Sequence, residues 1–177
     1  MHADRRHEQV ALAPLTTLGI GGPARWFARA THVEDLLTAS RSEGEPLFVL
    51  GGGSNLVISD EGFNGLVLQI AIGGVKTTGD GEDVIVTAGA GESWDSLVES
   101  AVRAEFAGIE CLSGIPGTVG GTPIQNVGAY GQEVATVIEW VAAYARVKRT
   151  TVQLSRDDCG FAYRTSRFKR EDAGRFM

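Results

Sequence analysis

The chain has 177 residues, of which 43% are hydrophobic and 21% charged, as expected for a globular protein with one good core or two smaller ones. A formal net charge of −6 argues against non-specific binding to nucleic acid, and no apolar run is long enough for a signal peptide or a membrane span. The two cysteines and three histidines show no metal-ligand spacing. We therefore expect plain thiols, a cytoplasmic location, no metal and no obligate protein partner.

The charge is unevenly distributed along the chain. Residues 1–145 contain 7 Lys/Arg and 18 Asp/Glu, a balance of −11, whereas residues 146–177 contain 9 and 4, a balance of +5. Two interpretations of this basic segment stay open. It faces an anionic small ligand such as a nucleotide sugar, or it is a solvated surface.

The first part of the chain predicts strands around one helix. After a polar start, residues 16–30 combine turn signals with short apolar pieces, and the helical spacing of residues 33–44 follows Thr31 as a possible N-cap. A buried strand is then predicted at 47–50 and a glycine turn at 51–55. Two further strands are predicted at 56–59 and 65–70. This β-α-β order predicts a small lobe over residues 1–70.

Residues 71–177 predict a larger lobe with helices and an antiparallel sheet. Residues 84–91 are strand-like, and residues 93–106 have the spacing of an amphipathic helix. Ser93 is its expected N-cap, and Trp94 is expected in the core rather than stacked on a ligand. The two strands of a hairpin are predicted at 137–146 and 150–155, and a helical turn at 155–158.

The first glycine cluster, GIGGPA at residues 19–24, formally matches the G-x-G-x-x-A dinucleotide fingerprint. That fingerprint requires a strand before it, a helix after it and an acidic residue further on. No clear strand precedes Gly19, and Pro23 with the following aromatic pair favours a turn that enters a strand. We therefore reject a Rossmann-type site here.

The second cluster, LGGGSN at residues 50–55, lies at the C-terminal end of a predicted strand. Consecutive glycine N–H groups in such a place can converge on one anion, and Ser54 and Asn55 add hydrogen-bonding side chains. No G-K-[ST] follows, so the cluster is not a P-loop. A phosphate site and an ordinary tight turn both stay open.

The third cluster, SGIPGTVGGTPIQNVGAYG at residues 113–131, contains six glycines and two prolines. Its apolar side chains would be costly to leave in water, which disfavours a flexible linker. A long loop inside a compact domain is usually functional. We expect this loop to be packed and to face a ligand, with Gln125 and Asn126 suited to the edge of a heterocycle.

Four segments in order, TTLGIGGPA, LGGGSNLVISDEGFNGLVL, SGIPGTVGGTPIQNVGAYGQE and FAYRTSRFK, resemble the UDP-N-acetylenolpyruvoylglucosamine reductase (MurB) family over residues 14–170. The resemblance implies an α+β fold, a two-lobed FAD-binding domain of the vanillyl-alcohol oxidase-like type. It also implies non-covalent FAD, NADPH as co-substrate, and reduction of the enolpyruvyl ether of UDP-N-acetylglucosamine to UDP-N-acetylmuramic acid in peptidoglycan precursor synthesis.

The resemblance carries cofactor-binding roles onto both glycine loops, because a pyrophosphate needs N–H donors without bulk. The implied FAD-binding residues are Gly51, Gly52, Gly53, Ser54, Asn55, Gly114, Ile115, Pro116, Gly117, Thr118, Gly120, Gly121, Gln125, Asn126 and Tyr130. Tyr163 and Arg164 match a substrate-binding Tyr-Arg pair. The resemblance implies that the catalytic Arg164 binds the substrate carboxylate and stabilises the negative charge that develops there.

The sequence departs from the family pattern at its end. In the family a substrate domain follows, with a proton-donating serine and an assisting glutamate that match no residue of this chain; Glu133 is expected to be solvated. We therefore expect a truncated chain that lacks the substrate domain. The alternative is a non-catalytic flavin- or nucleotide-binding module of the same fold. A third interpretation, an oxidase of the related flavoprotein superfamily, has less support. The glycine loops contain no histidine or cysteine, so nothing in them indicates covalently bound flavin.

Overall fold

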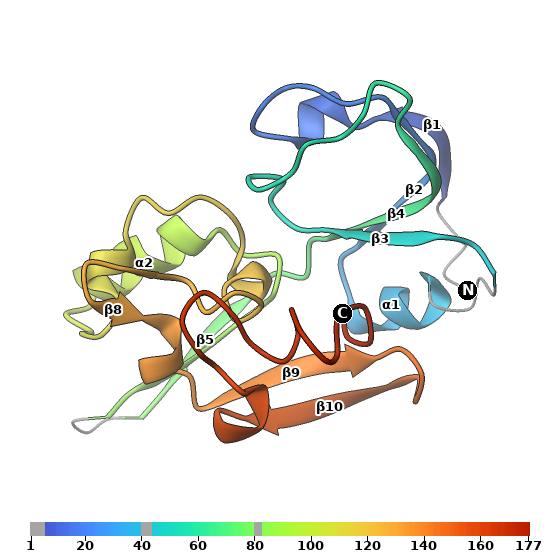
Figure 1. The fold of residues 1–177 in the computed structure, drawn as a ribbon. Helices are drawn as coiled ribbons and strands as arrows, with labels where there is room; N and C mark the ends of the chain where they lie inside the picture. Colours follow the sequence, from blue (N-terminus) through green and yellow to red (C-terminus); the bar gives the residue numbers. More distant parts are fainter. Residues whose placement is uncertain (1–5, 40–43, 80–82) are drawn as a thin grey trace. The chain divides into compact units, whose positions relative to one another are not determined.

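The computed structural model describes residues 6–39, 44–79 and 83–177. The chain divides into two compact units, Met1–Ile72 and Gly73–Met177, which are described one at a time (Figure 1). Among the described residues, no helix is long and apolar enough to cross a bilayer.

The first unit is built on a four-stranded mixed sheet in the spatial order β1-β2-β4-β3. Its strands are β1 (His7–Ala11), β2 (Pro23–Ala30), β3 (Leu47–Leu50) and β4 (Phe63–Ile70). β4 is parallel to both β2 and β3, whereas β1 is antiparallel to β2. The helix α1 (Val33–Ala39) makes the crossover from β2 to β3, as the β-α-β order predicts.

The position of β4 in the middle of the sheet follows from its sequence. Its residues 65–68 are all buried, which is typical of a strand covered on both faces. Leu50 and Val67 form the core with Leu12 and Ala24, and all four residues are fully buried. A short 3₁₀ helix, Ala13–Leu15, follows β1 in the chain.

Two sequence predictions for this unit are wrong. The polar start contains the edge strand β1, whose residues are mostly exposed and so lack the alternating apolar pattern of a strand. The second strand predicted at 56–59 does not form. Leu56 and Ile58 pack on the core, which accounts for their apolar character, but their backbone is irregular.

Over its described residues, 73–79 and 83–177, the second unit has three antiparallel two-stranded ladders and one α-helix. The ladders are β5 (Val75–Thr78) with β6 (Ile85–Ala88), β7 (Gly128–Ala129) with β8 (Gln132–Glu133), and β9 (Trp140–Ala145) with β10 (Thr150–Ser155). Four 3₁₀ helices complete it, at Glu110–Leu112, Val119–Gly121, Val134–Thr136 and Asp157–Cys159. The predicted hairpin over β9 and β10 is confirmed.

The helix α2 (Trp94–Arg103) holds the core of this unit. Ser93 caps it as predicted, because its hydroxyl accepts a hydrogen bond of 3.3 Å from the N–H of Ser96. Trp94 is 4% exposed, and its indole N–H donates to the carbonyl of Leu112 at 3.1 Å. The prediction that Trp94 is a core residue is therefore confirmed.

Candidate functional site

The loop at residues 51–55 directly follows β3, as predicted. Gly53 is buried with a φ of 70°, and a Cβ at this position would overlap the carbonyl oxygen of Leu15. The carbonyl of Gly53 accepts a hydrogen bond of 3.1 Å from the N–H of Thr17. Within the described part of the chain, no hydrogen bond has the N–H of Gly51, Gly52 or Gly53 as its donor. These N–H groups suit an anion.

Three exposed aliphatic side chains flank this glycine loop. Leu18, Ile20 and Val57 are 60%, 47% and 77% exposed. Their two segments lie together, because the N–H of Gly22 donates to the carbonyl of Ser59 at 2.8 Å. Sequence reasoning did not single out these residues, although apolar residues beside glycine turns are a signal for a ligand-facing surface.

The long loop at residues 113–131 is packed, as expected, and the flexible-linker alternative is wrong. Backbone hydrogen bonds and one carboxylate fix it to the start of α2 and to the segment before it. The tethers are Gly114 N–H to Asp95 Oδ1 (2.6 Å), Trp94 N–H to the Gly117 carbonyl (3.1 Å), Val119 N–H to the Glu92 carbonyl (2.9 Å) and Gly120 N–H to the Ala90 carbonyl (2.9 Å). The loop also buries Val127 in the core.

The glycines of this loop have different physical reasons. A Cβ on Gly120 would lie 2.7 Å from the Cβ of Ala90, so packing requires glycine there. Gly114 has a φ of 76°, so its backbone conformation favours glycine. Gly121 has neither reason: no atom lies within 4 Å of a Cβ built on it, and its φ is not positive. Its missing side chain leaves open space beside the backbone.

Asn126 connects three segments of the second unit through hydrogen bonds of its side chain. The residue is only 1% exposed and has a φ of 47°. The amide nitrogen donates to Glu133 Oε2 at 2.8 Å and to the carbonyl of Ala162 at 3.1 Å, while Oδ1 accepts from the N–H of Ala135 at 3.1 Å. Both amide protons are thus used inside the unit. Glu133, expected to be simply solvated, is instead half-buried and paired with Asn126.

Tyr163 and Arg164 occupy the tip of a two-residue turn. Ala162 and Thr165 close this turn with two backbone hydrogen bonds of 3.0 and 3.1 Å. Arg164 has a φ of 52°, a left-handed conformation that is uncommon for arginine. Its guanidinium carbon lies 5.5 Å from the centre of the exposed Tyr163 ring. Within the described residues the guanidinium has no hydrogen-bond acceptor and no carboxylate within 4.0 Å.

The structure brings this turn and the long loop together. Asn126 binds the Ala162 carbonyl at one end of the turn, and the buried Ser166 hydroxyl donates to the Ile124 carbonyl at 2.7 Å at the other end. A Cβ on Gly128 would lie 3.3 Å from a terminal guanidinium nitrogen of Arg164. The arginine head therefore lies against the loop's own backbone.

The other predicted residues of the long loop lie in several different environments. Gln125 is half-buried, and Tyr130 is 91% exposed with a φ of 48° at the turn between β7 and β8. Ile115 packs against the core of the second unit. Thr118 forms an isolated antiparallel bridge with Ser93.

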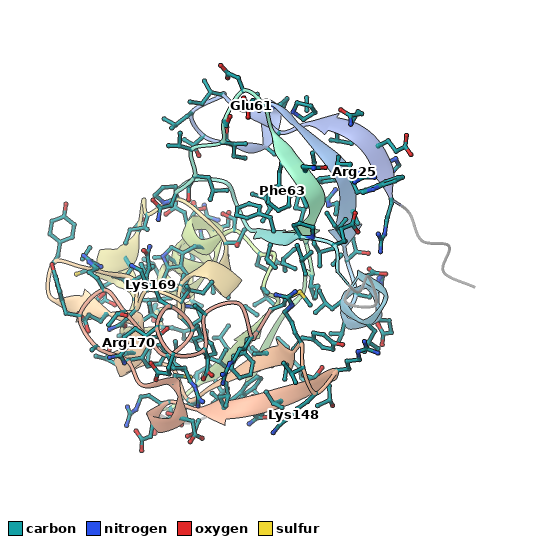
Figure 2. The ribbon with its side chains drawn as sticks, turned by 45° about the vertical axis from the view of Figure 1, so that its right-hand side comes forward. Arg25, Glu61, Phe63, Lys148, Lys169 and Arg170 are labelled. Atoms are coloured by element: carbon teal, nitrogen blue, oxygen red, sulfur yellow. The ribbon has the colours of Figure 1, made fainter. Side chains whose placement is uncertain are left out.

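Much of the basic segment is used by the fold itself. Arg167 and Arg175 both bind Asp172, at 2.6 and 3.0 Å, and the hydrogen bond from Arg167 holds the pKa of that carboxyl below its usual value. Arg170 donates to the Gly160 carbonyl, and Lys169 to the carbonyl of Arg164 at 3.3 Å. Figure 2 shows Lys169 and Arg170 on the C-terminal coil, with Lys148 at the end of the β9–β10 hairpin.

The cysteines fit the expected plain thiols. Both are free, and burial raises the pKa of Cys159 to about 11, so this thiol stays protonated near neutral pH. Among the described residues, no three His, Cys, Asp or Glu side chains are grouped to hold a metal ion.

Known proteins are similar to this chain in sequence and in fold. A family model described as an FAD binding domain matches residues 26–150. The UDP-N-acetylenolpyruvoylglucosamine reductase of Streptomyces coelicolor is 51% identical, over 90% of this chain and 42% of that protein. The crystal structure of the reductase (MurB) from Thermus caldophilus has a TM-score of 0.72 and 34% identity, over 92% of this chain and 56% of that one. A Brevibacterium sterolicum cholesterol oxidase shares the fold alone, with a TM-score of 0.55 and 13% identity, over 84% of this chain and 31% of that one.

These similarities confirm the expected α+β fold of the vanillyl-alcohol oxidase-like FAD-binding type. The chain spans about half the length of the curated relatives it matches. The resemblance drawn from four sequence segments is confirmed across nine-tenths of the chain. Because the family model covers most of its residues, the chain belongs to the FAD-binding domain family, and it is similar to the UDP-N-acetylenolpyruvoylglucosamine reductases.

Proposed function

We propose that the chain binds FAD non-covalently and serves the NADPH-dependent reduction of the enolpyruvyl ether of UDP-N-acetylglucosamine. One observation carries the proposal: the second unit joins a glycine-rich loop with open space at Gly121 to Arg164, whose charge has no carboxylate partner among the described residues. The names of the similar proteins support the choice of substrate. We place the reaction in the cytoplasm, in keeping with two free cysteines.

The residues of both glycine loops suit FAD. In the first unit, the N–H groups of Gly51, Gly52 and Gly53 supply donors for a pyrophosphate, and the exposed Leu18 and Val57 supply an apolar border. In the second unit, the open space at residue 121 admits a bulky ligand close to the backbone.

The further cofactor-binding residues we propose are the neighbours of these positions in the two loops. They are Ser54, Asn55, Gly114, Ile115, Pro116, Gly117, Thr118, Gly120, Gln125, Asn126 and Tyr130. Because the side chain of Asn126 is occupied by protein partners, we assign it the role of holding the loop in shape rather than of donating to the flavin edge.

Arg164 has the properties of an anion-binding catalytic residue. FAD held by these loops would supply the hydride-transfer chemistry that links NADPH to the β-carbon of the enolpyruvyl group. The guanidinium of Arg164 binds the substrate carboxylate through its planar fork and stabilises the negative charge that develops beside the α-carbon. Tyr163, whose ring lies beside that guanidinium, orients the arginine and covers the substrate.

The cofactor is tested by titrating FAD into the purified chain. We expect a yellow complex that survives gel filtration and loses its absorbance on addition of NADPH. A chain that stays colourless after incubation with FAD contradicts the proposal. A complex that binds FAD but whose spectrum never responds to UDP-N-acetylglucosamine enolpyruvate supports the alternative, a non-catalytic binding module.

The role of Arg164 is tested by substitution in the FAD-loaded protein. Because a hydrogen-bonded ionic contact contributes about 1.5–3 kcal/mol, Arg164→Ala should weaken substrate binding by about 10- to 100-fold. Arg164→Lys should recover only part of the loss, since lysine lacks the fork. The matched control is Arg103→Ala on α2, an exposed arginine paired with Glu99 at 2.6 Å, which should bind substrate and FAD normally. Equal binding by Arg164→Ala and the control would rule out the assigned role.

A further inference from the structure

Arg164 depends on a conformation that arginine rarely adopts. Its left-handed φ of 52° is energetically unfavourable for arginine and persists only where the surrounding structure imposes it. The two backbone hydrogen bonds across the turn fix its ends but do not attach it to the rest of the unit. Something outside the turn must therefore set where the guanidinium points.

Ser166 attaches one end of the turn through its hydrogen bond of 2.7 Å to the Ile124 carbonyl, and Asn126 with Glu133 attaches the other end. Asn126 donates one amide proton to the Ala162 carbonyl, which is the same carbonyl that accepts from Thr165 across the turn. Its other amide proton goes to Glu133 Oε2 at 2.8 Å, and Oδ1 accepts from the Ala135 N–H.

This arrangement fixes the orientation of the Asn126 amide. If the amide were reversed, its oxygen would face two acceptors, the Glu133 carboxylate and the Ala162 carbonyl, and its nitrogen would face the Ala135 N–H. The carboxylate of Glu133 and the N–H of Ala135 therefore together hold the amide with its nitrogen toward the turn. Glu133 reaches this place because β7 and β8 pair Gly128 with Glu133.

We propose that Asn126 and Glu133 are a positioning pair that holds the Tyr163–Arg164 turn in register with the glycine loop. The pair touches no substrate and acts through the Ala162 carbonyl. The inference rests on the proposed function, in which Arg164 binds the substrate carboxylate. Loss of the pair lets the turn move, and displacement of a binding group by about 1 Å is enough to cost about 100-fold in rate.

The test compares Asn126→Ala, Asn126→Asp, Glu133→Ala and Glu133→Gln in the full FAD-loaded chain. We expect both Asn126 variants and Glu133→Ala to raise the dissociation constant for UDP-N-acetylglucosamine enolpyruvate by about tenfold or more, and by a larger factor than they raise the dissociation constant for FAD. The aspartate keeps the shape but replaces the donor with an acceptor facing Glu133. Glu133→Gln keeps an acceptor for Asn126 and should restore most of the substrate affinity.

A second readout reports on the turn itself. Trypsin cleaves after exposed arginines once the backbone opens locally, so the positioning pair should protect the Arg164–Thr165 bond. We expect Asn126→Ala to accelerate cleavage at this bond several-fold relative to cleavage after Arg103. Val98→Ala, which removes a fully buried side chain of the same unit, is the control for general loss of stability and should not show this selectivity.

The outcomes separate the two proposals. Normal substrate binding by Arg164→Ala overturns the proposed function. If Arg164→Ala is impaired but Asn126→Ala and Glu133→Ala bind substrate normally, the positioning pair is refuted and the proposed function stands. The pair is equally refuted if Glu133→Gln is as impaired as Glu133→Ala, or if Val98→Ala reproduces both effects at the same temperature.

Discussion

Gly120 and Gly121 are adjacent glycines that should respond in opposite ways to the same added methyl group. A Cβ at Gly121 meets no atom within 4 Å, whereas a Cβ at Gly120 would lie 2.7 Å from Ala90 Cβ and 3.1 Å from the Ala90 carbonyl oxygen. Because its backbone is compatible with alanine, Gly121→Ala should leave the free energy of unfolding unchanged or raise it by about 0.4–1 kcal/mol. Gly120→Ala should lower it by about 1–3 kcal/mol through overpacking.

The two substitutions should also differ in their effect on the affinity for FAD, with Gly121→Ala acting directly and Gly120→Ala only through its loss of stability. If Gly121 leaves space for the cofactor, its methyl group removes that space, and FAD affinity should fall tenfold or more, equivalent to about 1.4 kcal/mol. Any loss in Gly120→Ala should follow its loss of stability and shrink when the assay temperature is lowered.

The assay pairs thermal unfolding of the FAD-free proteins with FAD titration followed by flavin fluorescence. For a chain of this size, 1 kcal/mol shifts the melting temperature by about 2–4 °C, so the two variants are easily distinguished. Wild-type FAD affinity in a stable Gly121→Ala protein would refute the reasoning that the open space at residue 121 holds the cofactor.

Two further predictions concern the frame around the site. Trp94→Phe removes the indole donor to the Leu112 carbonyl and leaves that buried acceptor unsatisfied, so the free energy of unfolding in urea should fall by about 1–3 kcal/mol; an unchanged urea midpoint would contradict it. The hydrogen bond from Arg167 lowers the pKa of Asp172 below 3.8, so its ion pairs stabilise the fold above that pH and are lost as pH falls through the lowered value. Asp172→Asn should therefore be less stable than wild type at neutral pH, and the difference should narrow in acid unfolding curves; a gap that is constant with pH would show that the carboxylate charge is not involved.

Local patterns were enough to predict several elements. The apolar spacing of α2 and its Ser93 cap are local properties, and so are the apolar run of β9 and the alternating burial of β10. The packed character of residues 113–131 follows from apolar side chains that glycine and proline keep out of regular structure. The rejected fingerprint at residues 19–24 runs directly into the strand β2, which begins at Pro23, and not into a helix.

What the sequence did not reveal depends on contacts between distant residues. β1 is mostly exposed, so no apolar pattern marks it, and it is held by its pairing with β2. The side chain of Asn126 joins residues 36 positions apart, and its partner Glu133 looks like any surface glutamate until β7 and β8 pair. Composition shows that an asparagine can donate twice, but not which two acceptors it reaches.

The strand order β1-β2-β4-β3 has a consequence for biosynthesis. β3 has a single neighbour, β4, which is made later, so during translation β3 and the glycine loop after it have no ladder to join. Among the described strands of this unit, β1 and β2 are the one pair that can close before residues 63–70 leave the ribosome. The strand that leads into the loop at residues 51–55 therefore joins the sheet only when β4 inserts between β2 and β3.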